Sequence, residues 1–197
     1  MQNRERLKKI LCGKSIKRGD FTLASGRKSD YYMDARLTTL DAEGAYCVGL
    51  AVLDILKTFT PYPKAIGGLT MGADPIVAVV AALSHQQGGP HISGFLVRKE
   101  PKKHGTQQFI EGYQGQPGDP VVIVDDVCTT GGSTIKAIEQ ARASGLNVIA
   151  ALYIVDREEG GREAIEKLCP FYALFTAQEL LEVVPKNSEI NNSVDRV

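Results

Sequence analysis

The sequence predicts an α/β fold in which a mainly parallel central sheet is flanked by helices. Short apolar stretches of strand composition alternate with stretches of helical period along most of the 197 residues. Polar, glycine-rich segments follow several of these strands, which is where ligands bind in open α/β sheets. A chain of this length can bury one complete core, so residues 1–197 are predicted to form a single domain.

The N-terminal part stands outside this alternation. An apolar face at helical spacing predicts a short helix over 2–12, and a Gly/Ser-centred turn between extended pieces is predicted over 20–36. We therefore expect residues 1–36 to form a small N-terminal hood over a site built by the rest of the chain.

The alternation itself begins at Asp41, a predicted N-cap for a helix over 41–58. The elements that follow are a strand at 65–69, a helix at 72–83, strands at 91–97 and 121–125, a helix at 133–144 ended by Gly145, a strand at 147–155, a helix at 161–168, a strand at 171–175 and a final helical turn capped by Thr176. The stretch 98–119 has few apolar residues and is predicted to be a mobile catalytic loop, because long irregular segments in compact domains are usually functional.

Composition excludes several classes of protein. The formal net charge is zero and the pI is about 6.8, which argues against a nucleic-acid-binding surface. There is no apolar run long enough for a membrane span and no secretory signal at the N-terminus. The four cysteines show no pairing or metal spacing, so the expected location is the cytoplasm.

The most informative segment is 121–134, VVIVDDVCTTGGST. An apolar strand leads into two adjacent carboxylates, Asp125 and Asp126, and then into a loop rich in glycine and hydroxyl groups that enters a helix. Such a loop presents backbone N–H groups to a phosphate, whereas the acidic pair suits sugar hydroxyls or hydrated Mg²⁺. It is neither a Walker A loop nor a dinucleotide fingerprint. An ordinary capped turn would not explain two costly carboxylates, so the pattern indicates a phosphorylated ribose.

Three further segments are ambiguous when taken singly. The run Arg98–Gly105, RKEPKKHG, can neutralise a dense anion, but such runs are often solvated surface charge. The segment 21–34, FTLASGRKSDYYMD, is compatible with a charged surface hairpin. The segment 155–161, VDREEGG, offers an arginine that can pair with a carboxylate, or only a surface ion pair.

Together, however, these segments resemble the orotate phosphoribosyltransferases, a branch of the type I phosphoribosyltransferase family. The matching motifs are SGRKSxYY at 25–32, GGLTMGADP at 67–75, RKxxKxHG at 98–105, the phosphoribosyl pyrophosphate (PRPP) signature at 121–134 and DRxEGG at 156–161. The PRPP signature alone would indicate only the superfamily, whereas the other motifs point to the orotate branch.

The resemblance implies a role for each matched residue. Arg98, Lys99, Lys102 and His104 would contact PRPP or pyrophosphate, and the rest of the PRPP site would be Asp125, Asp126, Val127, Cys128, Thr129, Thr130, Gly131, Gly132 and Ser133. Orotate would be bound by Thr129, Arg157, Tyr32 and Met33. The catalytic residues implied are Lys102, His104, Arg98 and Asp126.

The implied reaction is transfer of a phosphoribosyl group from PRPP to orotate, giving orotidine 5′-monophosphate and pyrophosphate in de novo pyrimidine biosynthesis. The implied cofactor is Mg²⁺, held mainly through PRPP rather than by direct protein ligands, and the implied assembly is a homodimer with shared active sites. Two alternatives remain, a purine or uracil phosphoribosyltransferase of the same fold and a PRPP-sensing regulator that binds nucleic acid without turnover.

The sequence departs from the family pattern at two cations. Some members carry lysine where this chain has Ala24 and Gly72, so its contacts to pyrophosphate are in question there. Backbone N–H groups of Met71, Gly72 and Ala73 could substitute. Cys128 lies within the phosphate loop and is either a partly exposed, oxidation-sensitive thiol or a packed side chain.

Overall fold

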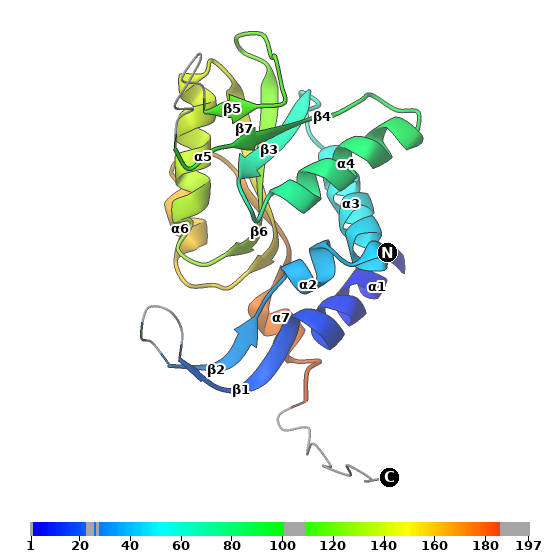
Figure 1. Cartoon of the computed structure of the whole chain (residues 1–197), viewed down its shortest axis with the longest axis vertical. Helices are drawn as coiled ribbons and strands as arrows, with labels where there is room; N and C mark the ends of the chain where they lie inside the picture. The colour runs from blue at the N-terminus through cyan, green and yellow to red at the C-terminus, as the bar shows by residue number, and fades with distance from the viewer. Residues whose placement is uncertain (1, 23–25, 27, 101–108, 186–197) are drawn as a thin grey trace.

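The computed structural model describes residues 2–22, 26, 28–100 and 109–185 and has a six-stranded sheet between two layers of helices (Figure 1). The order across the sheet is β5 (Ile110–Glu111), β4 (Ser93–Val97), β3 (Ala65–Leu69), β6 (Pro120–Cys128), β7 (Asn147–Asp156) and β8 (Phe171–Thr176). Neighbouring strands run parallel except for the edge strand β5, which is antiparallel to β4. The predicted mainly parallel sheet is therefore confirmed.

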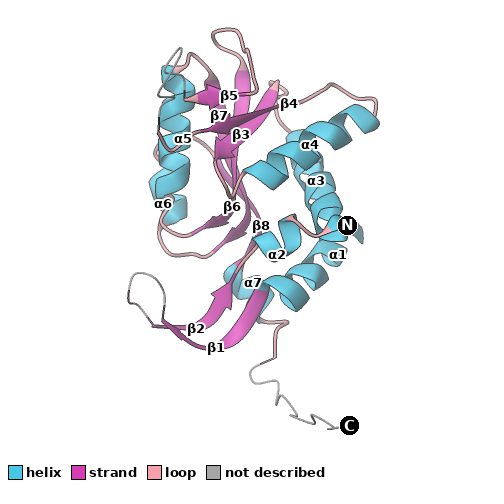
Figure 2. Ribbon diagram, viewed as in Figure 1, coloured by secondary structure: helices cyan, strands magenta, loops and turns pink. Residues whose placement is uncertain are grey.

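Helices cover both faces of the sheet, as Figure 2 shows. Side chains of β6 alternate between two cores: Val122 and Val124 pack on one side, Val121 and Ile123 on the other. The first core includes α1 (Gln2–Ile10), α3 (Ala42–Leu56), α4 (Asp74–Gln86) and α7 (Ala177–Leu181). The second includes α5 (Gly132–Ala143) and α6 (Gly161–Glu166).

Local signals placed several helix ends correctly. The Asp41 carboxylate accepts a hydrogen bond from the Gly44 N–H at 3.0 Å and caps α3. The Thr176 hydroxyl accepts one from the Glu179 N–H at 3.1 Å and caps α7. Gly145 ends the α5 region with a φ of +85°, a conformation that favours glycine.

The N-terminal region divides into two parts. Helix α1 packs on α3, and Leu7 of α1 and Leu11, which begins the helical turn Leu11–Ser15 after it, are buried in the first core, so this part belongs to the main body. Strands β1 (Ile16–Thr22) and β2 (Lys28–Met33) instead form a separate antiparallel hairpin, which leads into the short helix α2 (Arg36–Thr39). The hairpin is thus the part of residues 1–36 that pairs separately from the central sheet, although Ile16, Tyr31 and Met33 also join the first core. That it covers the site as a hood stays a prediction.

The predicted loop 98–119 contains the strand β5, which its sequence did not indicate. Residues 101–108 lie outside the described residues, as does the tail 186–197. Beyond β5, the buried Asp119 carboxylate accepts hydrogen bonds from the Lys64 Nζ, the Tyr113 hydroxyl and the Gln116 N–H at 2.7, 2.8 and 2.7 Å. These bonds tie residues 113–119 to the amino end of the sheet. In the described ranges, no helix is long and apolar enough to span a membrane.

Candidate active site

The acidic pair lies at the carboxyl end of β6, and most of its polar atoms are engaged. Asp125, 7% exposed, accepts hydrogen bonds from the Ser133 hydroxyl at 2.7 Å and from the Asp126 N–H at 3.0 Å. Asp126 accepts one from the Val127 N–H at 2.8 Å. These bonds orient both carboxylates, so that the pair is arranged before any ligand binds.

Burial raises the pKa of both carboxyl groups above the ordinary value for aspartate. At Asp126, the Val127 N–H and the positive charge of Arg36 act in the opposite direction. The pair therefore holds negative charge at an energetic cost, which favours binding of hydroxyl donors or a cation beside it.

The loop after β6 leads directly into α5. Gly131 has a φ of +78° and forms the N-cap, so the first amides of a helix of 12 residues are directed towards the same end of the sheet. Thr129, Thr130, Gly132 and Ser133 lie in or beside this turn. Unpaired N–H groups and the helix dipole at such a position favour an anion.

Cys128 turns away from the site. It is 1% exposed and packs in the second core, and burial raises the pKa of its thiol to about 11. Of the two alternatives that the sequence left open, the structure shows the packed side chain rather than the partly exposed thiol. Any contact of Cys128 with PRPP would have to come from its backbone.

The loop after β3 approaches the acidic pair closely. A Cβ atom on Gly72 would lie 2.2 Å from Asp125 Oδ1 and 2.9 Å from Asp126 Oδ1, so only glycine fits in this arrangement. The Ala73 N–H donates to the Leu69 carbonyl at 3.4 Å, which leaves it less suited to bind an anion than we expected. The Thr70 hydroxyl donates to Asp74 at 2.7 Å and steadies the same turn.

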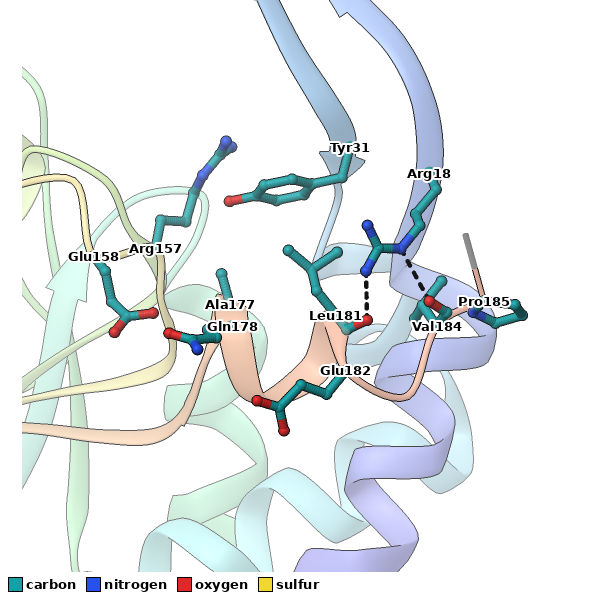
Figure 3. Close-up of a pocket in the computed structure, with 10 residues that line it drawn as sticks. All are labelled: Arg18, Tyr31, Arg157, Glu158, Ala177, Gln178, Leu181, Glu182, Val184 and Pro185. Carbon is teal, nitrogen blue, oxygen red and sulfur yellow. Dashed lines mark hydrogen bonds between the residues drawn. The ribbon is translucent and has the colours of Figure 1, made fainter. Parts of the chain in front are cut away.

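Arg157 follows β7 and is held on several sides. Its N–H donates to the Cys128 carbonyl at 2.9 Å, its guanidinium pairs with Glu159 at 2.8 Å, and the guanidinium carbon lies 4.7 Å from the centre of the Tyr31 ring. Tyr31 and Arg157 also line a cavity of about 500 Å³ that lies between the hairpin and α7 (Figure 3). There the Arg18 guanidinium donates to the carbonyls of Leu181 and Val184, which ties the hairpin to α7.

The turn that follows Arg157 depends on Asp156. This carboxylate is 1% exposed, accepts from the Glu158 N–H at 2.9 Å and pairs with Arg162 at 3.1 Å. Glu158 has a φ of +58°, and Gly160 has a φ of +90°. Because these are unfavourable or glycine-specific conformations, the bonds of Asp156 stabilise the turn that carries Arg157.

The two predicted orotate contacts on β2 differ in their surroundings. Met33 is buried and lines the cavity beside the acidic pair. Tyr32 is 42% exposed, and its ring packs at 5.7 Å from that of Phe21. Tyr31, rather than Tyr32, is the tyrosine that contacts Arg157. Side chains alternate along β2, so Tyr31 and Met33 share one face and Tyr32 lies on the other, and this alternation could have indicated Tyr31 from the sequence.

The cationic segment is described only at its start. Arg98 is exposed and pairs with Glu111 of β5 at 2.8 Å, and it lines a neighbouring cavity. Lys99 lines the cavity of the acidic pair. Lys102 and His104 lie outside the described residues, so their predicted roles remain predictions.

One open cavity of about 430 Å³ brings residues from all these motifs together. It is lined by Met33, Asp34, Ala35, Arg36, Leu69, Thr70, Met71, Gly72, Lys99, Asp125, Asp126, Val127, Thr129, Ser133 and Arg157. Chemically, the cavity combines an acidic pair, an anion-binding helix start and separate cations. No group of three or more metal-ligating side chains occurs among the residues that the structure describes.

Comparison with known proteins identifies the family. No family model matches the chain. Orotate phosphoribosyltransferase of Aquifex aeolicus is 46% identical over 185 residues, covering 92% of this chain and 99% of the relative. The orotate phosphoribosyltransferase of Mycobacterium tuberculosis, solved with Fe(III) dicitrate, has a TM-score of 0.77 and 32% identity over 90% of this chain and 98% of its own. A second structure of that enzyme, solved with PRPP, has a TM-score of 0.73 and 28% identity over the same shares of the two chains. The chain therefore belongs to the orotate phosphoribosyltransferase family.

Proposed function

We propose that this protein transfers the phosphoribosyl group of PRPP to N1 of orotate, giving orotidine 5′-monophosphate and pyrophosphate in de novo pyrimidine biosynthesis. The observation that carries the proposal is the single cavity in which Asp125 and Asp126 lie beside the start of α5. It combines acceptors for ribose hydroxyls with amide donors for a phosphate. A member of the family has been solved in complex with PRPP, a molecule that carries both ribose hydroxyls and a phosphate.

The lining of the cavity suggests where each part of the two substrates binds. The 5′-phosphate binds at the start of α5, along residues 129–133, while Asp125 and Asp126 accept hydrogen bonds from the ribose hydroxyls. Orotate lies against Arg157, whose guanidinium suits a planar carboxylate, with Thr129 and Met33 beside the ring. The family resemblance adds Tyr32, which lies on the exposed face of β2 and does not line the cavity. The diphosphate meets Arg98, Lys99, Lys102 and His104, two of which are within the described residues.

Catalysis then depends on charge and position. The C1′–O bond to pyrophosphate breaks as N1 of orotate attacks from the opposite face, with oxocarbenium character at C1′. Lys102, His104 and Arg98 stabilise the departing diphosphate, and the Asp126 carboxylate stabilises positive charge on the ribosyl ring. No covalent nucleophile is required.

The donor set also fits Mg²⁺. PRPP would hold the ion mainly, and the oxygens of Asp125 and Asp126 can accept hydrogen bonds from its water ligands. A nearby positive charge would also offset the burial that raises the pKa values of the two carboxyl groups. When bound, Mg²⁺ neutralises negative charge on the diphosphate.

We further propose a homodimer with shared active sites, working in the cytoplasm. Leu37 of α2, Leu40 just after it and Tyr46 in α3 are 50%, 71% and 48% exposed, and α2 also carries Arg36 of the cavity wall. Burial of such apolar side chains against a second copy would be favourable. The four cysteines are free thiols, which suits a reducing compartment.

The test is orotate consumption followed by ultraviolet absorbance with PRPP and Mg²⁺. The wild-type protein should consume orotate, and Lys102→Ala should lower kcat by about a hundredfold or more. Lys103→Ala is the matched control, because it removes the same charge from a neighbouring position that the family motif does not include. Measurable PRPP binding without orotate turnover would refute the proposal and favour another base or a sensor.

A further inference from the structure

Arg36 occupies the cavity wall that the hairpin and α2 provide. Its guanidinium forms a two-point ion pair with Asp34, with Nε–Oδ1 at 2.9 Å and Nη2–Oδ2 at 3.0 Å. The Arg36 N–H also donates to Asp34 Oδ1 at 3.1 Å. The side chain is 47% exposed, so this pair holds the guanidinium in place without burying it.

The pair leaves binding capacity on the guanidinium. An arginine has five N–H donors in a fixed plane, and the two bonds to Asp34 use one edge. The remaining donors are available to an anion in the cavity that Arg36 lines. An arginine oriented by a carboxylate loses little freedom on binding a second partner.

Arg36 also acts electrostatically on the acidic pair. Its charge lowers the pKa of Asp126, and the Asp126 charge raises that of Arg36. The two groups therefore lie within charge–charge range across the cavity. An anion bound beside the ribose, on the side of Asp126, would feel the same positive charge.

A group with several negative charges needs compensating positive charge if it is to bind in this cavity. The lining contains three carboxylates, Asp34, Asp125 and Asp126, and the proposed function already assigns the Arg157 guanidinium to the carboxylate of orotate. Gly72 cannot carry a charged side chain in this arrangement, because even a Cβ would collide with Asp125. A group with several negative charges therefore meets its positive charge, among the described residues of the lining, mainly at Arg36 and Lys99.

We propose that Arg36, oriented by Asp34, contacts the diphosphate group of PRPP and of the pyrophosphate product. The inference rests on the proposed function and adds to it a substrate-binding residue that the sequence motifs do not contain. It also offers an answer to the loss of lysine at Ala24 and Gly72: the charge is supplied from α2 instead.

The test measures binding of magnesium pyrophosphate alone by titration calorimetry, together with KM for PRPP and for orotate. Arg36→Ala should weaken pyrophosphate binding and raise KM for PRPP about tenfold or more, with KM for orotate changed less than about twofold. Arg36→Lys should recover part of the affinity. Arg6→Ala is the matched control, because Arg6 is likewise an exposed arginine in an ion pair, with Glu43 on the surface of α1 and α3.

The outcomes separate this inference from the proposed function. Unchanged pyrophosphate affinity in Arg36→Ala would overturn the inference, as would equal losses for pyrophosphate and orotate, which would indicate general damage to the cavity. If the wild-type protein does not consume orotate but binds pyrophosphate in an Arg36-dependent way, the proposed function fails and the diphosphate contact stands. Thermal melting of each variant identifies any loss caused by unfolding.

Discussion

Gly72→Ala tests the close approach between the loop after β3 and the acidic pair. The added Cβ would lie 2.2 Å from Asp125 Oδ1, whereas ordinary contacts begin near 3.4 Å, so something must move by about 1 Å. Asp125 cannot yield easily, because Ser133 and the Asp126 N–H hold it. The loop must therefore move away from the site.

The expected cost follows from this geometry. Overpacking of a tight site costs about 1–3 kcal/mol, which in a chain of this size lowers Tm by about 2–12 °C. The displaced loop should also lower kcat/KM for PRPP by about tenfold or more. Differential scanning calorimetry and the orotate assay measure the two effects.

A matched control and a double variant complete the experiment. Gly89→Ala adds the same methyl group where nothing lies within 4 Å, so Tm and kcat/KM should stay at the wild-type values. In an Asp125→Ala background, the closer clash partner is gone and only the 2.9 Å approach to Asp126 Oδ1 remains, so Gly72→Ala should cost less stability. Wild-type Tm and activity in Gly72→Ala, or an equal loss of stability in both backgrounds, would refute the reasoning.

Three further predictions concern single side chains. Because burial raises the Asp125 pKa to about 6, its charged form costs stability once pH exceeds the ordinary value near 4. Asp125→Asn should therefore raise Tm relative to wild type, increasingly from pH 4 to about pH 6 and by a constant amount above it, while reducing turnover, and a Tm difference that does not change between pH 4 and pH 6 would contradict this. Asp156→Ala removes the carboxylate that bonds to the Glu158 N–H and to Arg162 in the turn that carries Arg157. It should raise KM for orotate about tenfold and KM for PRPP by less, as measured by steady-state kinetics, and equal changes in the two KM values would argue against this role. Cys128 should react with a thiol reagent more slowly than the half-buried Cys12, since burial raises its pKa to about 11; mass spectrometry of the modified peptides would reveal a reversed order if this is wrong.

Much of the fold was accessible from the sequence because its signals are local. A run of apolar β-formers ending in two carboxylates indicated both β6 and the site at its end. Asp41 and Thr176 indicated where helices begin, since an N-cap acts within one turn. The motif at 121–134 likewise carries its chemistry in consecutive residues, so it could be read without a structure.

Elements that depend on distant partners were not accessible. Strand β5 is two residues long and exists because it pairs with β4, which no local pattern reports. Helix α1 was placed with the hood, yet its apolar face packs on α3. The orientation of Cys128 was left open, and packing of the second core decided it.

By itself, the sequence determined the fold class, the family and the chemistry of the acidic pair and phosphate loop, because strand period, helix caps and contiguous motifs are written in neighbouring residues. Only the tertiary structure decided which side chains share the cavity. It brought Arg36 of α2 towards Asp126 of β6, set Tyr31 rather than Tyr32 against Arg157, and closed Gly72 onto Asp125. Those relations depend on how the hairpin, the loop after β3 and the sheet pack together. Alternation along β2 separates Tyr31 from Tyr32, but no local pattern reports which distant residues the packing brings together.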